Sequence, residues 1–172
     1  MSTYVISFEE VNWGALLLAI TMAIHGTGMF GILTLYDSLN DRIERSESFL
    51  IGLCAVVVAS LLIVLTNILE VIVWSGFFLL RGAQPSHSIA FYNALLNYTT
   101  LQAGYLPQRL HLLEPLLGMA GLLTVAWSTG ILYMLAQSFQ DRQLRIRKRR
   151  RESKAQASTK PQPGAQAEKT HS

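Results

Sequence analysis

A polar segment interrupts the apolar C-terminal half of the chain. It lies between two long apolar stretches and consists of Tyr98, Thr99, Thr100, Leu101, Gln102, Ala103, Gly104 and Tyr105. A polar loop at membrane depth is tolerated only where it faces protein or water instead of lipid. The segment is therefore predicted to be a pore loop, whose chemistry would be the passage of ions.

Two further polar residues, His25 and Glu70, lie inside apolar stretches. A charged residue at the centre of a spanning helix costs about 2.5 to 3.5 kcal/mol, so Glu70 needs a partner or a proton. Counted from Gly14 and Leu80, which the topology below places on the same side, His25 is about 17 Å deep and Glu70 about 15 Å deep. We therefore predict a hydrogen bond between them.

This pair has three interpretations. It can be structural, fixing the register of two helices. It can be pH-sensitive, because a histidine near a carboxylate titrates close to neutrality. A metal site is the weakest of the three, because two ligands alone do not define one. Thr66 and Asn67, one turn before Glu70, are alternative partners that would make His25 dispensable.

Three apolar stretches have the roughly 20 residues needed to cross a hydrocarbon core about 30 Å thick. They occupy about 14–36, 49–80 and 112–138. Gly82 and Pro85 end the second stretch, and Ser86 or Ser88 can cap a new helix. The predicted fold is an all-α integral membrane protein with three transmembrane helices, plus a re-entrant pore helix and loop at about 86–107.

The polar stretch 37–48 is predicted to connect the first two spans and to be helical in part. Residues 1–140 then form one channel-like domain. Residues 141–172 begin with basic residues and continue with Ala, Gln, Lys, Pro and Ser, a composition that cannot bury a core. We predict a basic, disordered tail there.

Seven of the fourteen basic residues fall between Arg142 and Arg151. Basic residues close to a span end favour the cytoplasmic side. The predicted protein is therefore a multi-pass protein of the cell membrane with its N-terminus outside and its C-terminus in the cytoplasm, and the Thr-Thr loop faces the exterior. The expected partner is membrane lipid. Nucleic-acid binding is not predicted, because no aromatic residues or folded module accompany the run.

Enzymatic activity is not expected, because the sequence has no nucleophile-base-acid spacing and no phosphate-binding glycine loop. The single cysteine, Cys54, leaves no intrachain disulfide and no cysteine-based metal site. No cofactor and no metal site are expected, and the only small-molecule partner anticipated is a permeant monovalent cation.

Residues 90–101, AFYNALLNYTTL, resemble the pore helix and filter entry of small bacterial potassium-channel-like proteins, where an aromatic-rich helix runs into T-T-V/L-G-Y-G-D. The resemblance extends over about 67–137 through residues before and after the loop: Leu69, Glu70, Trp74, Arg109, Leu112, Leu113, Gly121, Trp127, Ser128 and Thr129. It implies a homotetramer in which four loops surround the ion, and filter oxygens replace the ion's water shell.

The resemblance makes Thr99 and Thr100 the filter-entry threonines and places the constriction at Leu101, Gln102, Ala103 and Gly104. Gln102 and Ala103 stand where the family has glycine and tyrosine, and Tyr105 replaces the usual acid. A glutamine at a left-handed backbone position costs on the order of 1 kcal/mol or more per subunit.

This departure implies a pore that is weakly selective or closed. Two functions therefore remain open: passive cation conduction, and a non-conducting, channel-derived membrane interaction or structural protein. Gly121 is a candidate hinge in the last span. Close helix packing is the commoner role of such small residues.

Overall fold

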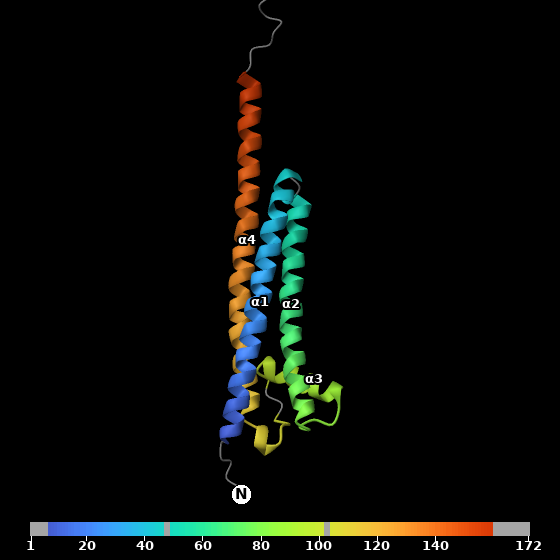
Figure 1. The fold of residues 1–172 in the computed structure, drawn as a ribbon. Coiled ribbons are helices and arrows are strands. Elements are labelled where there is room, and N and C mark those ends of the chain that lie inside the picture. The colour runs from blue at the N-terminus through green and yellow to red at the C-terminus, as the bar shows by residue number, and fades with distance from the viewer. Residues whose placement is uncertain (1–6, 47–48, 102–103, 160–172) are drawn as a thin grey trace, which may run out of the picture.

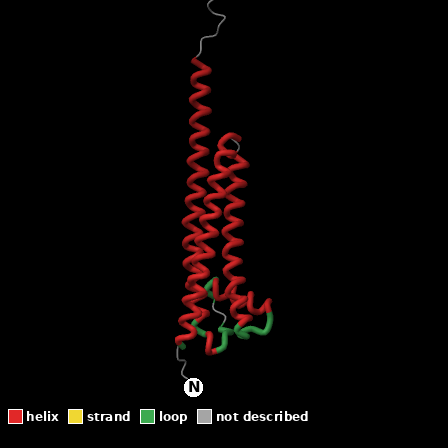
Figure 2. The backbone as a smooth tube through the Cα atoms, viewed as in Figure 1, coloured by secondary structure: helices red, strands yellow, loops and turns green. Residues whose placement is uncertain are grey.

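The computed structural model describes residues 7–46, 49–101 and 104–159. Within these ranges the chain forms helices and loops without a strand. The elements are α1 (Phe8–Ser46), α2 (Phe49–Leu80), α3 (His87–Tyr98), the short 3₁₀ helix η1 (Gln108–Leu110) and α4 (Leu113–Thr159). The three long helices lie side by side, and α3 and η1 sit at the end of the bundle where α1 begins (Figure 1). Most of the described loop residues gather at that same end (Figure 2).

The three long helices are each long and apolar enough to cross a membrane. The candidate spans are Phe8–Leu39, Phe49–Leu80 and Gln108–Gln156. Most residues of each apolar window are not buried on the single chain. Apolar surface of that extent is stable only against lipid or against another protein surface. The prediction of an all-helical protein with three apolar spans is therefore confirmed, and the short helix predicted between the last two is present as α3.

A capping box begins α1. The hydroxyl of Ser7 accepts from the backbone N–H of Glu9 at 3.2 Å, and the carboxylate of Glu10 accepts from the backbone N–H of Ser7 at 3.0 Å. Two of the N–H groups that a helix start leaves unpaired are thereby satisfied. The other carboxylate oxygen of Glu10 accepts from the N–H of Leu112 at 3.3 Å and so ties the start of α1 to the chain just before α4.

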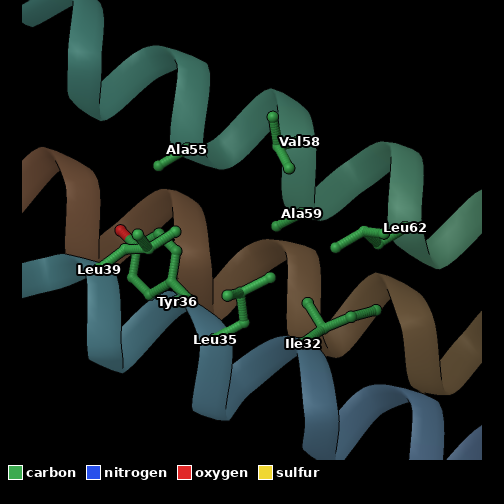
Figure 3. Close-up of a pocket in the computed structure, with 8 residues that line it drawn as sticks. All are labelled: Ile32, Leu35, Tyr36, Leu39, Ala55, Val58, Ala59 and Leu62. Atoms are coloured by element: carbon green, nitrogen blue, oxygen red, sulfur yellow. The ribbon is translucent and has the colours of Figure 1, made fainter.

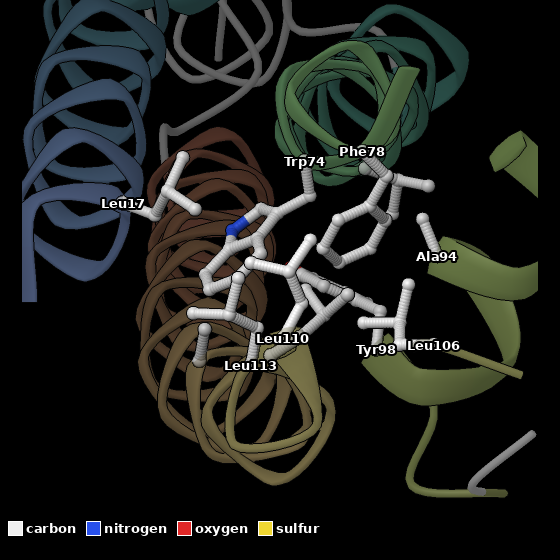
Figure 4. Close-up of a cluster of buried hydrophobic side chains, with 11 residues drawn as sticks. Leu17, Trp74, Phe78, Ala94, Tyr98, Leu106, Leu110 and Leu113 are labelled. Carbon is white, nitrogen blue, oxygen red and sulfur yellow. The ribbon is translucent and has the colours of Figure 1, made fainter. Parts of the chain in front are cut away.

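The main apolar core lies where α3 meets the three long helices (Figure 4). Trp74 and Phe78 of α2 are fully buried there, and Leu113 and Leu117 of α4 pack with them. Figure 4 shows Ala94 and Tyr98 of α3 facing the same cluster. The indole N–H of Trp74 donates to the hydroxyl of Thr21 at 2.8 Å, so its polar atom is also satisfied. This core holds α3 against the bundle.

A second, smaller core lies toward the α1–α2 connection. It contains Met29 and Ile32 of α1, Ala59 and Ile63 of α2, and Leu135 of α4. A pocket between α1 and α2 beside it is lined by apolar side chains and Tyr36 (Figure 3). None of the lining residues carries a charge, so the pocket offers no site for an ionic ligand.

One prediction about the polar segments needs correction. Residues 141–159 were predicted to be disordered, but α4 continues to Thr159. The stretch 37–48 is helical in part, as predicted, because α1 continues from the apolar span to Ser46. A core is not needed for this extension. Arg, Lys, Gln, Glu and Ala are strong helix formers, and a helix already nucleated in the span needs only elongation. Residues 160–172 of the predicted tail lie outside the described residues.

Candidate functional site

The short helix α3 is set against α4 at two glycines. A Cβ atom at Gly118 would lie 3.2 Å from the backbone oxygen of Asn97, and one at Gly121 would overlap the backbone oxygen of Tyr98. Only glycine permits this approach of the α3 end to α4. The structure thus gives Gly121 a packing role, within a helix that is continuous from Leu113 to Thr159. Its role as a hinge stays a prediction.

The last turn of α3 runs into a Schellman cap. The N–H of Thr100 donates to the oxygen of Asn97 at 2.9 Å, and the N–H of Leu101 donates to the oxygen of Leu96 at 2.9 Å. These two bonds satisfy carbonyl groups that a helix end would otherwise leave open. The predicted pore loop therefore begins as a tight turn that reverses the chain immediately after Tyr98.

Thr100 adopts a left-handed backbone conformation, with φ of 65°. For a β-branched residue this conformation is a genuine outlier, because its side chain crowds the backbone. It costs on the order of 1 to 2 kcal/mol. Such strain persists only where the surrounding structure imposes it, and it is concentrated at functional sites.

The residues of this turn are not covered by other parts of the chain. Thr99, Thr100, Leu101 and Gly104 are exposed on the single chain. The hydroxyl of Thr99 lies 3.0 Å from the oxygen of Leu95 and donates back into α3, which leaves its oxygen available as an acceptor. Gln102 and Ala103, the residues that depart from the filter pattern, lie outside the described residues.

A buried polar cluster lies behind the turn and takes side chains from all four α-helices. We define it as His25 of α1, Asn67 and Glu70 of α2, Tyr98 of α3, and Thr124 and Ser128 of α4. The Tyr98 hydroxyl donates to Oε2 of Glu70 at 2.7 Å and lies 2.5 Å from Oγ1 of Thr124. Nδ1 of His25 lies 2.8 Å from Oε1 of Glu70. Both oxygens of the fully buried Glu70 carboxylate are thereby paired.

The other ring nitrogen of His25 also has a partner. Its Nε2 lies 3.4 Å from the hydroxyl of Ser128. The Tyr98 hydroxyl is the donor to Oε2 of Glu70, because a carboxylate oxygen only accepts. The polar cluster is thus a connected network that fixes the last residue of α3.

The contact between His25 and Glu70 agrees with the depth estimate made from the sequence. Thr66, an alternative partner for Glu70, instead donates to the oxygen of Leu62 at 3.0 Å. The sequence interpretation missed Tyr98 as the second partner of Glu70. Depth counting could have placed only Thr124 near Glu70, because Thr124 lies eleven residues into α4, about 16 Å from its start, and Glu70 lies at a similar depth in α2.

The chain returning from the turn is anchored at the outer surface of the core. The backbone N–H of Leu106 donates to Oε1 of Glu114 at 2.8 Å. Arg109 donates to the backbone oxygen of Arg81 at 3.0 Å, and Arg81 pairs with Glu9. The turn is therefore held at both ends, by the polar cluster before it and by these contacts after it.

The part of the chain described by the structure contains no group of three His, Cys, Asp or Glu side chains arranged to hold a metal ion. The exposed turn itself carries the neutral hydroxyl groups of Thr99 and Thr100. No family model, curated protein or solved structure was found to match this chain.

Proposed function

We propose that this chain is a channel-like membrane protein that passes monovalent cations through a pore formed by the Thr99–Gly104 segments of four copies. One observation carries the proposal: the end of α3 is buried against three apolar spans, whereas the residues that follow it are exposed on the single chain. At membrane depth such a segment must face water or another protein surface.

The contacts of α3 support placing this segment at membrane depth. Tyr98 meets α4 at Gly121, eight residues after Leu113, which is about 12 Å along the helix. Its hydroxyl reaches Glu70, ten residues or about 15 Å before the end of α2. These distances, counted from the ends of the apolar helices, favour a re-entrant α3 that enters the membrane, stops and returns.

The chemistry of the segment also supports cation passage. Threonine hydroxyl and backbone carbonyl oxygens are the groups that replace the water shell of an ion in a selectivity filter. Residues 90–101 resemble the pore helix and filter entry of potassium-channel-like proteins, and Gln102 and Ala103 in place of glycine and tyrosine favour weak selectivity over strict potassium selectivity.

We further propose that the protein lies in the cell membrane with the segment on the exterior side. The cluster of basic residues in α4 after Asp141 supports a cytoplasmic C-terminus. Because α1 and α4 begin at the same end of the bundle, the N-terminus is then outside (Figure 1).

The proposal is tested by flux in reconstituted liposomes. Potassium, sodium and a larger organic cation are compared in separate preparations, and light scattering gives the number of chains per particle. We expect flux of the two small ions from a four-chain particle. A folded oligomer that passes none of the three contradicts the proposal and identifies a non-conducting membrane interaction protein.

The Gln102→Gly variant separates the two functions further. In a channel it restores a family-like residue at the constriction, so the ratio of potassium to sodium flux should rise. In a structural protein only the stability should change.

A further inference from the structure

The C-terminal third of α4 is a charged helix that leaves the bundle. Figure 1 shows α4 continuing beyond the end of the α1–α2 pair. Near the start of α2, α4 packs at Gly52, where an added Cβ would meet Phe139 and lie 3.3 Å from an Arg142 nitrogen. All residues from Arg147 to Gln156 are exposed.

The exposed part carries positive charge on every side. Arg147, Lys148, Arg149, Arg150 and Arg151 are consecutive, and five helical residues cover more than one full turn of 3.6 residues. The side chains therefore point in all directions around the axis. A folded protein partner would touch only one side of such a rod, whereas a layer of lipid headgroups surrounds it.

These charges extend from the headgroup layer into the zone of surface potential just beyond it. Asp141 is the first charged residue of α4 after Glu114 and marks the end of the apolar stretch. Arg145 lies about 6 Å beyond it along the helix and Arg151 about 15 Å. The headgroup layer is about 5 to 7 Å thick on each side, and the surface potential extends about 8 Å further at physiological salt.

We propose that residues 145–151 of α4 bind the anionic headgroups of the adjacent leaflet and so collect acidic lipids around the protein. Each basic residue near an anionic surface contributes favourably to such binding. Long arginine side chains also reach back toward the headgroups while the helix axis continues into water. This inference does not depend on whether the Thr99–Gly104 segment conducts.

The test counts the lipids bound to the full-length protein. The protein in a neutral detergent is incubated with equal amounts of phosphatidylcholine and phosphatidylglycerol, and the bound lipids are counted by native mass spectrometry. We expect phosphatidylglycerol to exceed phosphatidylcholine by about tenfold or more, since three basic residues are enough for such a factor. A ratio near one overturns the proposal.

Three variants show where the preference arises. The triple variant R147Q/R149Q/R151Q should reduce the ratio to near one, because it removes charge while glutamine keeps the helix. R147K/R149K/R151K should retain the preference. The matched control K154Q/K160Q/K169Q removes the same charge from positions farther along the chain and should change the ratio less than twofold. Equal loss in the first variant and the control contradicts the assignment.

Two control measurements exclude unfolding of the variants and binding of soluble anions as explanations. Circular dichroism verifies that the variants retain their helix content, and only folded variants are compared. Free glycerol phosphate is added in a further arm. If it displaces the lipid at equal concentration, the segment is a site for soluble anions and the proposal of lipid binding is wrong.

Discussion

Helices α2 and α3 end with the same type of cap but with different residues in it. In α2 the left-handed position is Gly82, with φ of 62°, and Gly82 and Ala83 donate to Leu79 and Phe78 at 2.9 Å. In α3 the corresponding position is Thr100. Glycine adopts this conformation without strain, whereas threonine does not. The end of α2 is therefore favoured by its local sequence, and the end of α3 must be imposed by tertiary contacts.

The two ends also differ in what lies behind them. Tyr98, the last residue of α3, joins the polar cluster and rests on Gly121. The polar cluster, and not the cap itself, therefore holds the start of the proposed pore segment. Substitutions that remove contacts of this cluster should destabilise the protein most.

Removal of Glu70 should have the largest effect. In the Glu70→Ala variant both His25 and Tyr98 lose their partner inside a buried network. Breaking a buried pair costs about 3 to 5 kcal/mol. We expect a loss of this size in the free energy of unfolding, measured by denaturant titration in micelles. Glu9→Ala, which removes an exposed carboxylate at the start of α1, should cost less than about 1 kcal/mol.

A double-mutant cycle shows whether His25 and Glu70 act together. The losses in the free energy of unfolding caused by His25→Ala and Glu70→Ala are added and compared with the loss in the double variant. The sum should differ from the double variant by about 0.5 to 3 kcal/mol, because the residues are in contact. Strict additivity would mean that no interaction joins them.

Replacing Gly121 by a larger residue should cause the next largest loss of stability. The added methyl group of Gly121→Ala overlaps the backbone of Tyr98, so α3 must move away from α4. Overpacking of this kind costs up to about 3 kcal/mol. Gly130→Ala is the matched control in the same helix, since nothing lies within 4 Å of that position. Equal stabilities of the two variants, measured by the same titration, would exclude the close contact between α3 and α4.

Loss of the Tyr98 hydroxyl should have a smaller effect. Tyr98→Phe keeps the ring in the core but leaves Oε2 of Glu70 without this donor. A hydrogen bond to a charged group contributes about 1.5 kcal/mol or more. Tyr92→Phe, at an exposed position of α3, should leave the free energy of unfolding unchanged. The comparison would fail if both substitutions had the same effect.

Replacement of Thr100 should change the stability least, and it should raise the stability instead of lowering it. Thr100→Gly gives the cap of α3 the residue found in that of α2 and relieves about 1 to 2 kcal/mol of strain. The greater backbone freedom of glycine in the unfolded chain offsets about 0.5 to 1 kcal/mol of this gain. We expect a small net stabilisation in thermal melts, together with altered ion flux. Destabilisation would show that Thr100 is not strained.

Local patterns in the sequence were sufficient to predict the three spans and the short helix, because long apolar stretches and terminating residues such as Gly82 and Pro85 act locally. The contact between His25 and Glu70 followed from depth alone, because both side chains had to avoid lipid. The hydrogen bond from Tyr98 to Glu70 was not predicted, since it forms only when α3 is docked against Gly121.

The extension of α4 was missed for a different reason. The polar composition of residues 141–172 predicts disorder, because such residues cannot form a buried core. A helix that leaves a span, however, needs only residues of high helix propensity to continue. The left-handed Thr100 was also beyond sequence reasoning, because threonine disfavours that conformation and only the surrounding contacts enforce it.

If the exposed turn after α3 faces water in the assembled protein, a cysteine placed there should react with a water-soluble reagent. In a Cys54→Ser background, Thr99→Cys and Leu122→Cys are both exposed on the single chain, but only the first lies in the proposed pore segment. A charged, water-soluble thiol reagent applied to liposomes should modify Thr99→Cys and block flux, while Leu122→Cys stays unmodified in lipid. Equal protection of both cysteines would contradict the account.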